Sequence, residues 1–291
     1  MDVGIGLPNA VPGTTGRQLG EWARRAEEAG FSTLGTIDRV TYPNLEPLIA
    51  LAAAAAVTER IKLATTILIA PYRANAALVA KQAASVQQIS NGRMVLGVAV
   101  GGREDDYAAS GVDFESRGGE NFESMLGRIT EVWAGSGTSS GAAADEGVGP
   151  DVAAKPPQLI LGGSIDAAFR RAAQYGDGWI MGGGTPEMLR DGREKLLAAW
   201  SDAGREGEPR VMALAYYSLG DDAEANANSY LKDYYAWLGE YADQIAGGAA
   251  KDADTIKGYQ QGFAEAGCDE LIWFPSSSDP TQVALLAEAA L

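Results

Sequence analysis

Residues 91–107 have the sequence Asn-Gly-Arg-Met-Val-Leu-Gly-Val-Ala-Val-Gly-Gly-Arg-Glu-Asp-Asp-Tyr, and this stretch determines how the rest of the chain is interpreted. Its middle, residues 94–100, is short and apolar, which is typical of a β-strand buried on both faces. A parallel strand of this kind delivers the residues after its carboxyl end to the edge where ligands bind. We therefore interpret the glycine-rich, charged residues 101–107 as an active-site loop. The alternative is an ordinary connection to the next helix.

Seven further segments match a strand pattern, and helical apolar periodicity follows each strand. These segments are residues 3–7, 31–37, 61–68, 158–161, 176–180, 211–217 and 270–274. Gly30, Gly176 and Gly267 each end a helix just before a strand, as short αβ loops require. Eight strand–helix units in 291 residues predict an α/β fold, a (β/α)8 TIM barrel that forms a single domain over residues 1–291. The competing architecture is a doubly wound open sheet, but no Gly-x-Gly-x-x-Gly motif opens the first helix.

The composition excludes several classes of function. With 39 acidic and 23 basic residues the net charge is -16, which disfavours nucleic-acid binding over a broad surface. Helix amino termini can still bind an anionic cofactor. The chain has no histidine and only Cys268, which excludes histidine-based nucleophiles, disulfides and zinc sites, so we predict no metal site. Neither a signal peptide nor an apolar run of ~18 residues is visible, and we expect a cytoplasmic protein that does not span a membrane.

One segment departs from the strand–helix pattern. Residues 135–157 are small, polar and acidic without any period, which predicts a flexible insertion in the barrel at about this position. The alternative is a mobile lid over the active site.

The carboxyl ends of the strands supply the candidate site residues. Gly162 and Gly163 let the backbone approach a ligand closely, and the helix that follows presents free N–H groups. Together with Ser164 they form a candidate phosphate cradle; the alternative is a plain turn in which Ser164 caps the helix. Asp38 and Arg39 could act as an acid or base and as an anion anchor, or they could form a mutual ion pair on the rim.

Aromatic residues gather at the same ends. Tyr42, Tyr72 and Tyr107 are candidates to line a flat aromatic pocket. The aromatic residues between 230 and 241 recur at helical spacing within a helix expected over residues 223–246. The tyrosines of this segment could line the same pocket, but we interpret Tyr230, Tyr234, Trp237 and Tyr241 as core.

The chain resembles the bacterial luciferase-like monooxygenases, which are barrels that use a flavin or the deazaflavin F420. The resemblance covers roughly positions 1–180, in the family's order, and the last third matches loosely. The matching pieces are residues 3–8 (Val-Gly-Ile-Gly-Leu-Pro), 29–31 (Ala-Gly-Phe), 56–63 (Ala-Val-Thr-Glu-Arg-Ile-Lys-Leu), 81–85 (Lys-Gln-Ala-Ala-Ser), 90–98 (Ser-Asn-Gly-Arg-Met-Val-Leu-Gly-Val), 103–107 (Arg-Glu-Asp-Asp-Tyr), and 162–179, from Gly162-Gly163-Ser164 to Gly176-Asp177-Gly178-Trp179.

The resemblance implies a cofactor, FMN or F420, that lies across the strand ends. It places Thr65 and Thr66 beside the ring, often next to a non-prolyl cis peptide. Gly101, Gly102 and Arg103 would flank the middle of the cofactor. The phosphate would lie on Gly162, Gly163 and Ser164, with Gly178 and Trp179 bordering the same end.

Two features depart from the family pattern. Many members carry a histidine after the second strand, where this chain has Asp38 and Arg39. Residues 135–157 also lack the ordered, aromatic pattern of relatives. The catalytic candidates are therefore Asp38 or Tyr107 for proton handling and Arg39 for anchoring the substrate.

These features lead to three hypotheses of function. The first is an FMN-dependent monooxygenase that oxidises a small organic substrate with oxygen and receives reduced FMN from a separate NAD(P)H:flavin reductase. The second is F420-dependent hydride transfer, for which Arg39, Arg73 and Arg103 are the candidate cations. The third is a flavin-binding relative without catalysis. The family resemblance also implies a homodimer.

Overall fold

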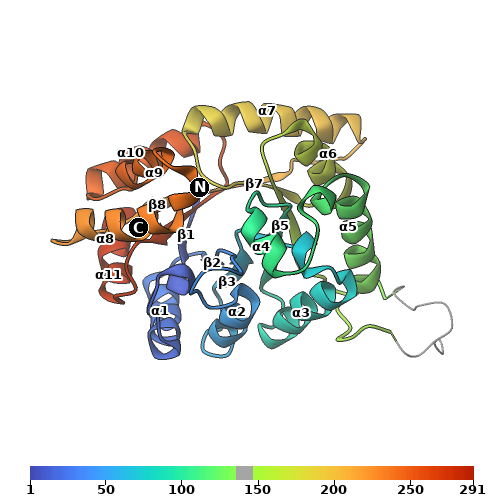
Figure 1. Cartoon of the computed structure of the whole chain (residues 1–291), viewed down its shortest axis with the longest axis horizontal. Helices are drawn as coiled ribbons and strands as arrows, with labels where there is room; N and C mark the ends of the chain where they lie inside the picture. The colour runs from blue at the N-terminus through green and yellow to red at the C-terminus, as the bar shows by residue number, and fades with distance from the viewer. Residues whose placement is uncertain (136–146) are drawn as a thin grey trace.

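The computed structural model describes residues 1–135 and 147–291, and it confirms the predicted TIM barrel. A closed, parallel sheet lies at the centre, and helices surround it (Figure 1). Parallel strands need crossover connections, and here helices provide them. The strands are β1 (Asp2–Gly6), β2 (Thr33–Thr36), β3 (Lys62–Thr65), β4 (Leu68–Ile69), β5 (Met94–Ala99), β6 (Gln158–Gly162), β7 (Gly178–Met181), β8 (Arg210–Tyr217) and β9 (Glu270–Pro275).

The third strand of the barrel is interrupted. β3 and β4 both pair with β5, so together they occupy one position in the ring. Between them the peptide bond from Thr66 to Ile67 is cis, beside the two threonines where the family resemblance placed such a bond. This interruption turns the chain at the mouth of the barrel.

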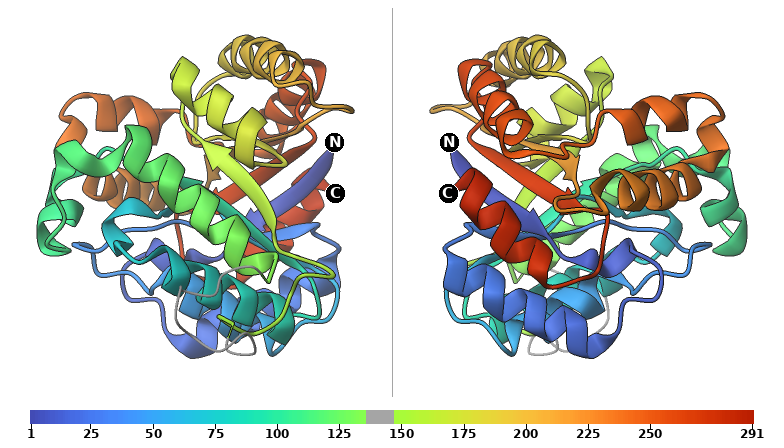
Figure 2. Two further views of the ribbon diagram at one scale, coloured as in Figure 1. Left: turned by 90° about the vertical axis from the view of Figure 1, so that its right-hand side faces the viewer. Right: turned by 90° about the vertical axis from the view of Figure 1, so that its left-hand side faces the viewer.

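Pairing between the two ends of the chain closes the barrel. β1 pairs with β9 over four residues, from Asp2 with Glu270 to Ile5 with Trp273. The two termini therefore lie close together on one side of the molecule (Figure 2). The first and last helices, α1 (Gly16–Ala29) and α11 (Thr281–Ala290), also pack against each other.

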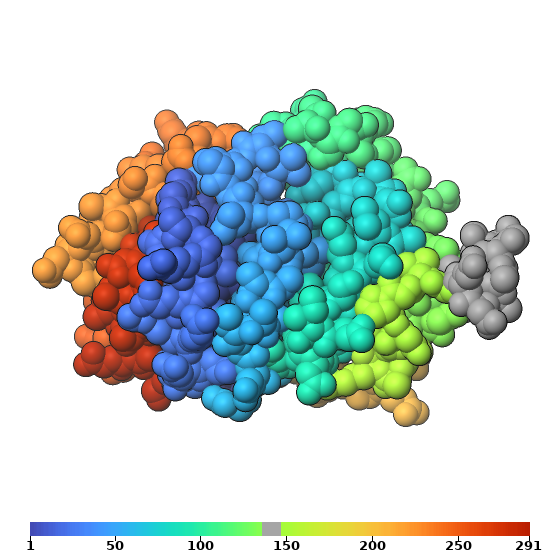
Figure 3. Space-filling model, turned by 90° about the horizontal axis from the view of Figure 1, so that it is seen from below, coloured from blue at the N-terminus to red at the C-terminus, as the bar shows by residue number. Residues whose placement is uncertain are grey.

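The outer layer consists of helices between the strands, and α1, α2 and α3 form neighbouring bands on one face (Figure 3). The remaining helices are α2 (Pro47–Ala55), α3 (Ala76–Ile89), α4 (Glu104–Ala109), α5 (Gly119–Trp133), α6 (Asp166–Tyr175), α7 (Pro186–Asp202), α8 (Ala223–Tyr234), α9 (Tyr241–Gly247) and α10 (Ala253–Glu265), with short 3₁₀ helices η1 (Pro8–Ala10), η2 (Pro71–Arg73), η3 (Phe114–Arg117) and η4 (Ala236–Leu238).

The helix expected over residues 223–246 is not continuous. α8 ends at Tyr234, η4 follows, and α9 begins at Tyr241. Gly239 has φ 58°, a conformation outside the right-handed helix that glycine adopts readily. The interruption leaves Trp237 and Tyr241 each 54% exposed, so the prediction that they are core residues was wrong, whereas Tyr230 and Tyr234 are buried as predicted.

Two apolar layers follow from the alternation of side chains along the strands. One lies between the strands and the outer helices and contains Leu34, Leu63 and Leu96. The other fills the barrel, with Ile160 and Met212, and continues up to α8 and α9. No helix in the described ranges is both long and apolar enough to cross a bilayer.

The insertion predicted at about 135–157 is described only in part. Residues 136–146 lie outside the described ranges. The alternative interpretation as a mobile lid therefore lies outside the described residues over that part. Residues 147–157 are attached to the barrel. Gln87 of α3 donates hydrogen bonds to the carbonyls of Lys155 and Pro156, and Val152 is buried in the core. Residues 147–157 are therefore packed against the barrel and do not form a flexible insertion.

Candidate active site

A cavity of about 220 Å³ lies at the mouth of the barrel. Its walls come from the end of β2, the β3–β4 junction, the loop after β5, β8 and the segment around η4. Ligands of TIM barrels bind at this face, which is where the sequence placed the active site. The lining residues that carry functional groups are Asp38, Thr66, Tyr72, Arg103, Asp106, Tyr107, Tyr216, Tyr234, Tyr235 and Trp237.

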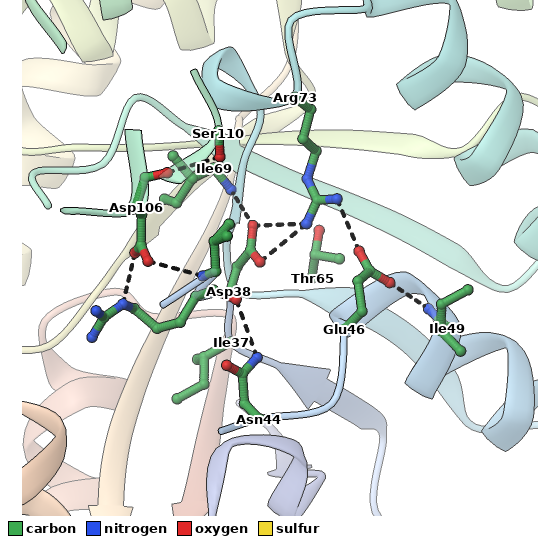
Figure 4. A network of polar contacts seen from close by, with 12 residues as sticks. Ile37, Asp38, Asn44, Glu46, Ile49, Thr65, Ile69, Arg73, Asp106 and Ser110 are labelled. Carbon is green, nitrogen blue, oxygen red and sulfur yellow. Dashed lines mark hydrogen bonds and ion pairs between the residues drawn. The ribbon is translucent and has the colours of Figure 1, made fainter. Parts of the chain in front are cut away.

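Asp38 lines the cavity and is the centre of a buried polar network (Figure 4). Its carboxylate accepts two hydrogen bonds from Arg73 Nη2, both at 3.0 Å, and one from the Ile69 amide at 2.9 Å. Arg73 continues to Glu46 at 2.9 Å. Burial alone would lower the pKa of Arg73, but the charges of Asp38 and Glu46 outweigh it and raise that pKa. Asp38 thus fixes β4 and holds Arg73.

Arg39 points to a different set of partners. Its Nε binds Asp106 at 2.6 Å, and its Nη2 binds Asp105 at 2.7 Å and Thr41 at 2.9 Å. The side chains of Arg39 and Asp106 are only 6% and 3% exposed. The expected alternative of a mutual Asp38–Arg39 ion pair was therefore wrong, because each residue is paired elsewhere. Arg39 does not line the cavity as described, which leaves its predicted role as a substrate anchor without structural support.

Tyr107 and Tyr72 lie edge to face in the cavity wall, with ring centroids 5.5 Å apart. The Tyr107 hydroxyl donates to the Val100 carbonyl at 2.5 Å, so it is occupied. The Tyr72 hydroxyl is buried beside the Asp38 carboxylate, which is close enough to raise its pKa, although the two do not form a well-aligned hydrogen bond. Burial raises the pKa of both phenols, and for Tyr72 the nearby Asp38 charge adds to the rise. Both hydroxyls therefore keep their protons at neutral pH.

Arg103 is the cation of the cavity that remains available. Its guanidinium lies 4.7 Å from the ring centroid of Tyr234 and 5.0 Å from that of Trp237, and it donates to the Tyr234 carbonyl at 2.9 Å. No carboxylate pairs with it within the described ranges, in contrast to Arg39 and Arg73. A guanidinium held by aromatic faces retains donors for an anionic group of a ligand.

The two threonines predicted beside the cofactor ring have different positions. Thr66 lines the cavity. The Thr65 hydroxyl instead exchanges hydrogen bonds with the Gly97 backbone, at 2.7 Å to the carbonyl and 2.9 Å from the amide, so it joins β3 to β5. Gly101 and Gly102 line the cavity as a turn, and Gly101 has φ 67°.

The predicted phosphate cradle stands apart from this cavity. Gly163 and Ser164 are exposed after β6, and the first residue of α6 is Asp166. The N-cap is Ile165, which makes no side-chain capping bond. The alternative in which Ser164 caps the helix was therefore wrong, and the amide groups of the first turn are free of such a cap.

Gly178 and Trp179 lie next to the predicted phosphate cradle, on the side away from the barrel mouth. Trp179 is 2% exposed and packs against Phe169 on the outer side of the barrel. Its indole donates to the Gly163 carbonyl at 2.7 Å, so it positions that glycine and does not face the mouth. Gly178 lies where β7 approaches β8, and a Cβ there would be 2.0 Å from the Arg210 carbonyl oxygen.

The C-terminal third contributes site residues for which the sequence favoured a place in the core. The tyrosines between 230 and 241, which include Tyr235, were the alternative candidates for the pocket, and Trp237 was assigned to the core. Both line the cavity, and the Tyr216 and Tyr235 hydroxyls lie 2.7 Å apart. The available signal was the aromatic density between positions 230 and 241, but helical spacing alone could not show that the helix is interrupted there.

The comparisons with known proteins agree with this architecture. The family model described as luciferase-like monooxygenase matches residues 1–267. An F420-dependent glucose-6-phosphate dehydrogenase of Amycolatopsis mediterranei is 29% identical over 209 residues, which are 67% of this chain and 61% of that protein.

Two solved structures share the fold over the whole length of the chain. An F420-dependent secondary alcohol dehydrogenase in complex with an F420-acetone adduct has a TM-score of 0.80 at 19% identity, over 99% of this chain and 97% of that one. The oxygenating constituent of 3,6-diketocamphane monooxygenase from Pseudomonas putida, in complex with FMN, has a TM-score of 0.71 at 16% identity, over 100% and 99%. With its closed barrel, its mouth cavity and a family match over residues 1–267, this chain belongs to the luciferase-like monooxygenase family.

Proposed function

We propose that this protein is an F420-dependent oxidoreductase that transfers a hydride between the deazaflavin and a small organic substrate. The observation that carries the proposal is the F420-dependent relative, which matches 67% of the chain at 29% identity. The F420-dependent alcohol dehydrogenase of similar fold supports it. F420 carries a phosphate and an acidic tail, and it therefore requires a cation that the protein does not already neutralise.

The residues at the mouth fit such a cofactor. At Gly101 a Cβ would lie 2.9 Å from Ile69, so the turn requires glycine and leaves a bare backbone beside the cavity. Thr66, Gly101 and Gly102 would hold the ring, and Arg103 would meet an acidic group. Gly163 and Ser164, at the uncapped start of α6, would hold the phosphate.

The side chains of the cavity suggest how the proton is handled without histidine. When bound, F420 supplies the ring that gives or takes the hydride. The Tyr72 hydroxyl is protonated at neutral pH and lies beside the Asp38 carboxylate, while its ring lines the same cavity. It would donate its hydrogen bond to the substrate oxygen, with Asp38 next to it. Asp38 and Tyr107 are otherwise engaged, so we assign them to positioning.

One observation favours a second candidate, an FMN-dependent monooxygenase. The diketocamphane monooxygenase in complex with FMN shares the fold over nearly its whole length. In that case a separate NAD(P)H:flavin reductase would supply reduced FMN. The turn at Gly163 and Ser164 would hold the phosphate of either cofactor.

Binding measurements distinguish the two candidates. The dissociation constants of the purified protein for F420 and for FMN, oxidised and reduced, can be measured by fluorescence. F420 binding at micromolar or tighter, with FMN at least about tenfold weaker, is the expected result. The reverse preference would support the monooxygenase, and binding of neither would refute both. Arg103→Gln should weaken F420 binding by about tenfold or more, whereas the exposed control Arg25→Gln should not.

A further inference from the structure

A second chamber adjoins the cavity at the barrel mouth. It has a volume of about 490 Å³ and lies between the loop after β7, the end of β8, and the helices α9 and α10. Gly182, Leu214, Tyr216 and Tyr235 line both spaces, so the chamber opens directly beside the cavity proposed for the cofactor ring. Its volume is within the range of pockets that hold a small organic molecule.

The lining of this chamber is uncharged. Among the described residues, no Asp, Glu, Lys or Arg contributes to it, although 21% of the chain is charged and the neighbouring cavity contains Asp38, Arg103 and Asp106. Leu238, Ile245 and Phe263 supply apolar surface. A charged ligand group would lose its hydration here without gaining a counter-ion.

The polar side chains of the chamber are all uncharged: Thr185, Tyr216, Tyr235, Tyr241, Gln244 and Tyr259. The Tyr216 and Tyr235 hydroxyls lie 2.7 Å apart, and the Tyr259 hydroxyl donates to the Gly248 carbonyl at 3.0 Å. At the rim Tyr241 is 54% exposed and Met188 is 53% exposed.

From these contacts we infer that the second chamber binds the substrate and that this substrate is an uncharged, aromatic or aliphatic organic molecule. The inference rests on the proposed function, because it takes the neighbouring cavity as the place of the cofactor ring. The chamber's composition disfavours a phosphorylated or carboxylated substrate. The Tyr216–Tyr235 pair lies at the boundary between the two spaces, and the reacting end of the molecule would pass it to enter the first cavity.

The test compares two probes that share a ring system and differ in charge. Calorimetry measures the binding of 2-naphthol, which is neutral at pH 7, and of 2-naphthoate, which is anionic. We expect 2-naphthol to bind at least about tenfold more tightly than 2-naphthoate. Tighter binding of 2-naphthoate, lost in Arg103→Gln, would overturn the inference, because the ligand would then be an anion held in the first cavity.

Two variants and a control locate the probe. Leu238→Glu and Ile245→Glu each place a carboxylate in the chamber, and each should weaken 2-naphthol binding by about tenfold or more. Ala236→Glu adds the same charge to an exposed position of η4 outside both linings and should leave binding unchanged. Circular dichroism confirms that each variant is folded. Equal 2-naphthol affinity in all three variants would refute the assignment of the chamber.

Measurements with F420 separate this inference from the proposed function. If F420 binds and 2-naphthol still binds to the F420-saturated protein, both stand. If F420 displaces 2-naphthol, the chamber belongs to the cofactor and the inference falls. If 2-naphthol binds as expected and F420 does not, the cofactor assignment falls while the neutral chamber remains. If F420 binds but neither naphthalene does, only the chamber assignment fails.

Discussion

Arg39 is the side chain whose expected role changes most. The sequence suggested a substrate anchor, but the structure places its guanidinium between Asp105 and Asp106. Removing one partner of a buried pair leaves the other charge without its counter-ion, here Asp106, which keeps only the hydrogen bonds from Val40 and Thr41. We predict that Arg39→Met lowers the free energy of unfolding by about 3–5 kcal/mol, as measured by urea denaturation.

The exposed Arg25 provides the matched control. It pairs with Glu21 on the surface of α1, with both side chains more than 40% exposed. Arg25→Met should change the unfolding free energy by less than about 0.5 kcal/mol. A loss in Arg39→Met no larger than in Arg25→Met would show that the Asp106 carboxylate finds other compensation.

Tyr72 is the side chain that we expect to act on the substrate. Tyr72→Phe keeps the ring and removes a buried hydroxyl that makes no well-aligned hydrogen bond to the neighbouring Asp38, so stability should change by less than about 1 kcal/mol. Turnover with F420 should fall by about a hundredfold, because the hydrogen-bond donor to the substrate oxygen is lost. Tyr175→Phe on α6 is the control for both assays. A drop in stability without a drop in kcat would assign Tyr72 to structural support of Asp38.

Sequence reasoning located the site but could not pair its side chains. Asp38, Arg103 and Tyr107 line the cavity as expected from their places after strands. The partners could not be predicted, because they come from distant positions. Arg73 reaches Asp38 from η2, and Asp106 reaches Arg39 from α4. The ends of the predicted strands indicate which residues lie together at the mouth of the barrel. Ion pairing depends on side-chain geometry, which the strand pattern does not encode.

Among the elements, the approach of β3 to β5 depends on a glycine. A Cβ on Gly97 would lie 2.1 Å from the Thr65 carbonyl oxygen, which is a backbone atom and cannot move aside cheaply. We predict that Gly97→Ala costs more than about 3 kcal/mol of stability. Gly127→Ala in α5 meets nothing within 4 Å and should stabilise by up to about 1 kcal/mol. Thermal unfolding measures both, and equal melting temperatures would contradict the close contact.

The junction between α1 and β3 should make stability depend on pH. The Glu27 carboxylate accepts hydrogen bonds from the amides of Glu59, Arg60 and Ile61 at 2.5–3.0 Å. Burial alone would raise the pKa of Glu27, but these backbone bonds outweigh it and lower the pKa below 4.5. Because the folded-state pKa is the lower one, the stabilisation is complete above about pH 4.5 and is lost as pH falls through the folded value.

Glu27→Gln tests this dependence. The variant should lose about 1 kcal/mol at pH 7, a value discounted because the carboxylate is partly exposed, and the difference from wild type should shrink below pH 4.5. Urea denaturation at several pH values measures it, with Glu28→Gln as the neighbouring control. A difference that stays constant down to pH 3 would show that the Glu27 charge is not involved.

The elements themselves were predicted best where the apolar pattern was uninterrupted. All eight barrel strands lie at or near their expected residues, since buried parallel strands form short apolar runs. The pattern failed at residues 223–246, where Gly239 breaks the helix. It also missed the break after Thr65, because residues 61–68 contain neither glycine nor proline and threonine is common in strands.

At the scale of the whole molecule, the excess of negative charge should lower the stability of the folded state. The chain carries a net charge of -16, and self-repulsion destabilises a compact state that concentrates like charges. The buried pairs of Arg39 and Arg73 are screened little, so added salt acts mainly on the exposed carboxylates. We therefore predict that the urea midpoint rises when NaCl increases from about 10 to about 150 mM, which shortens the screening length from about 30 to about 8 Å. Urea is the suitable denaturant because it is uncharged. A midpoint that falls with salt would mean that attractive surface pairs outweigh the repulsion of the excess carboxylates.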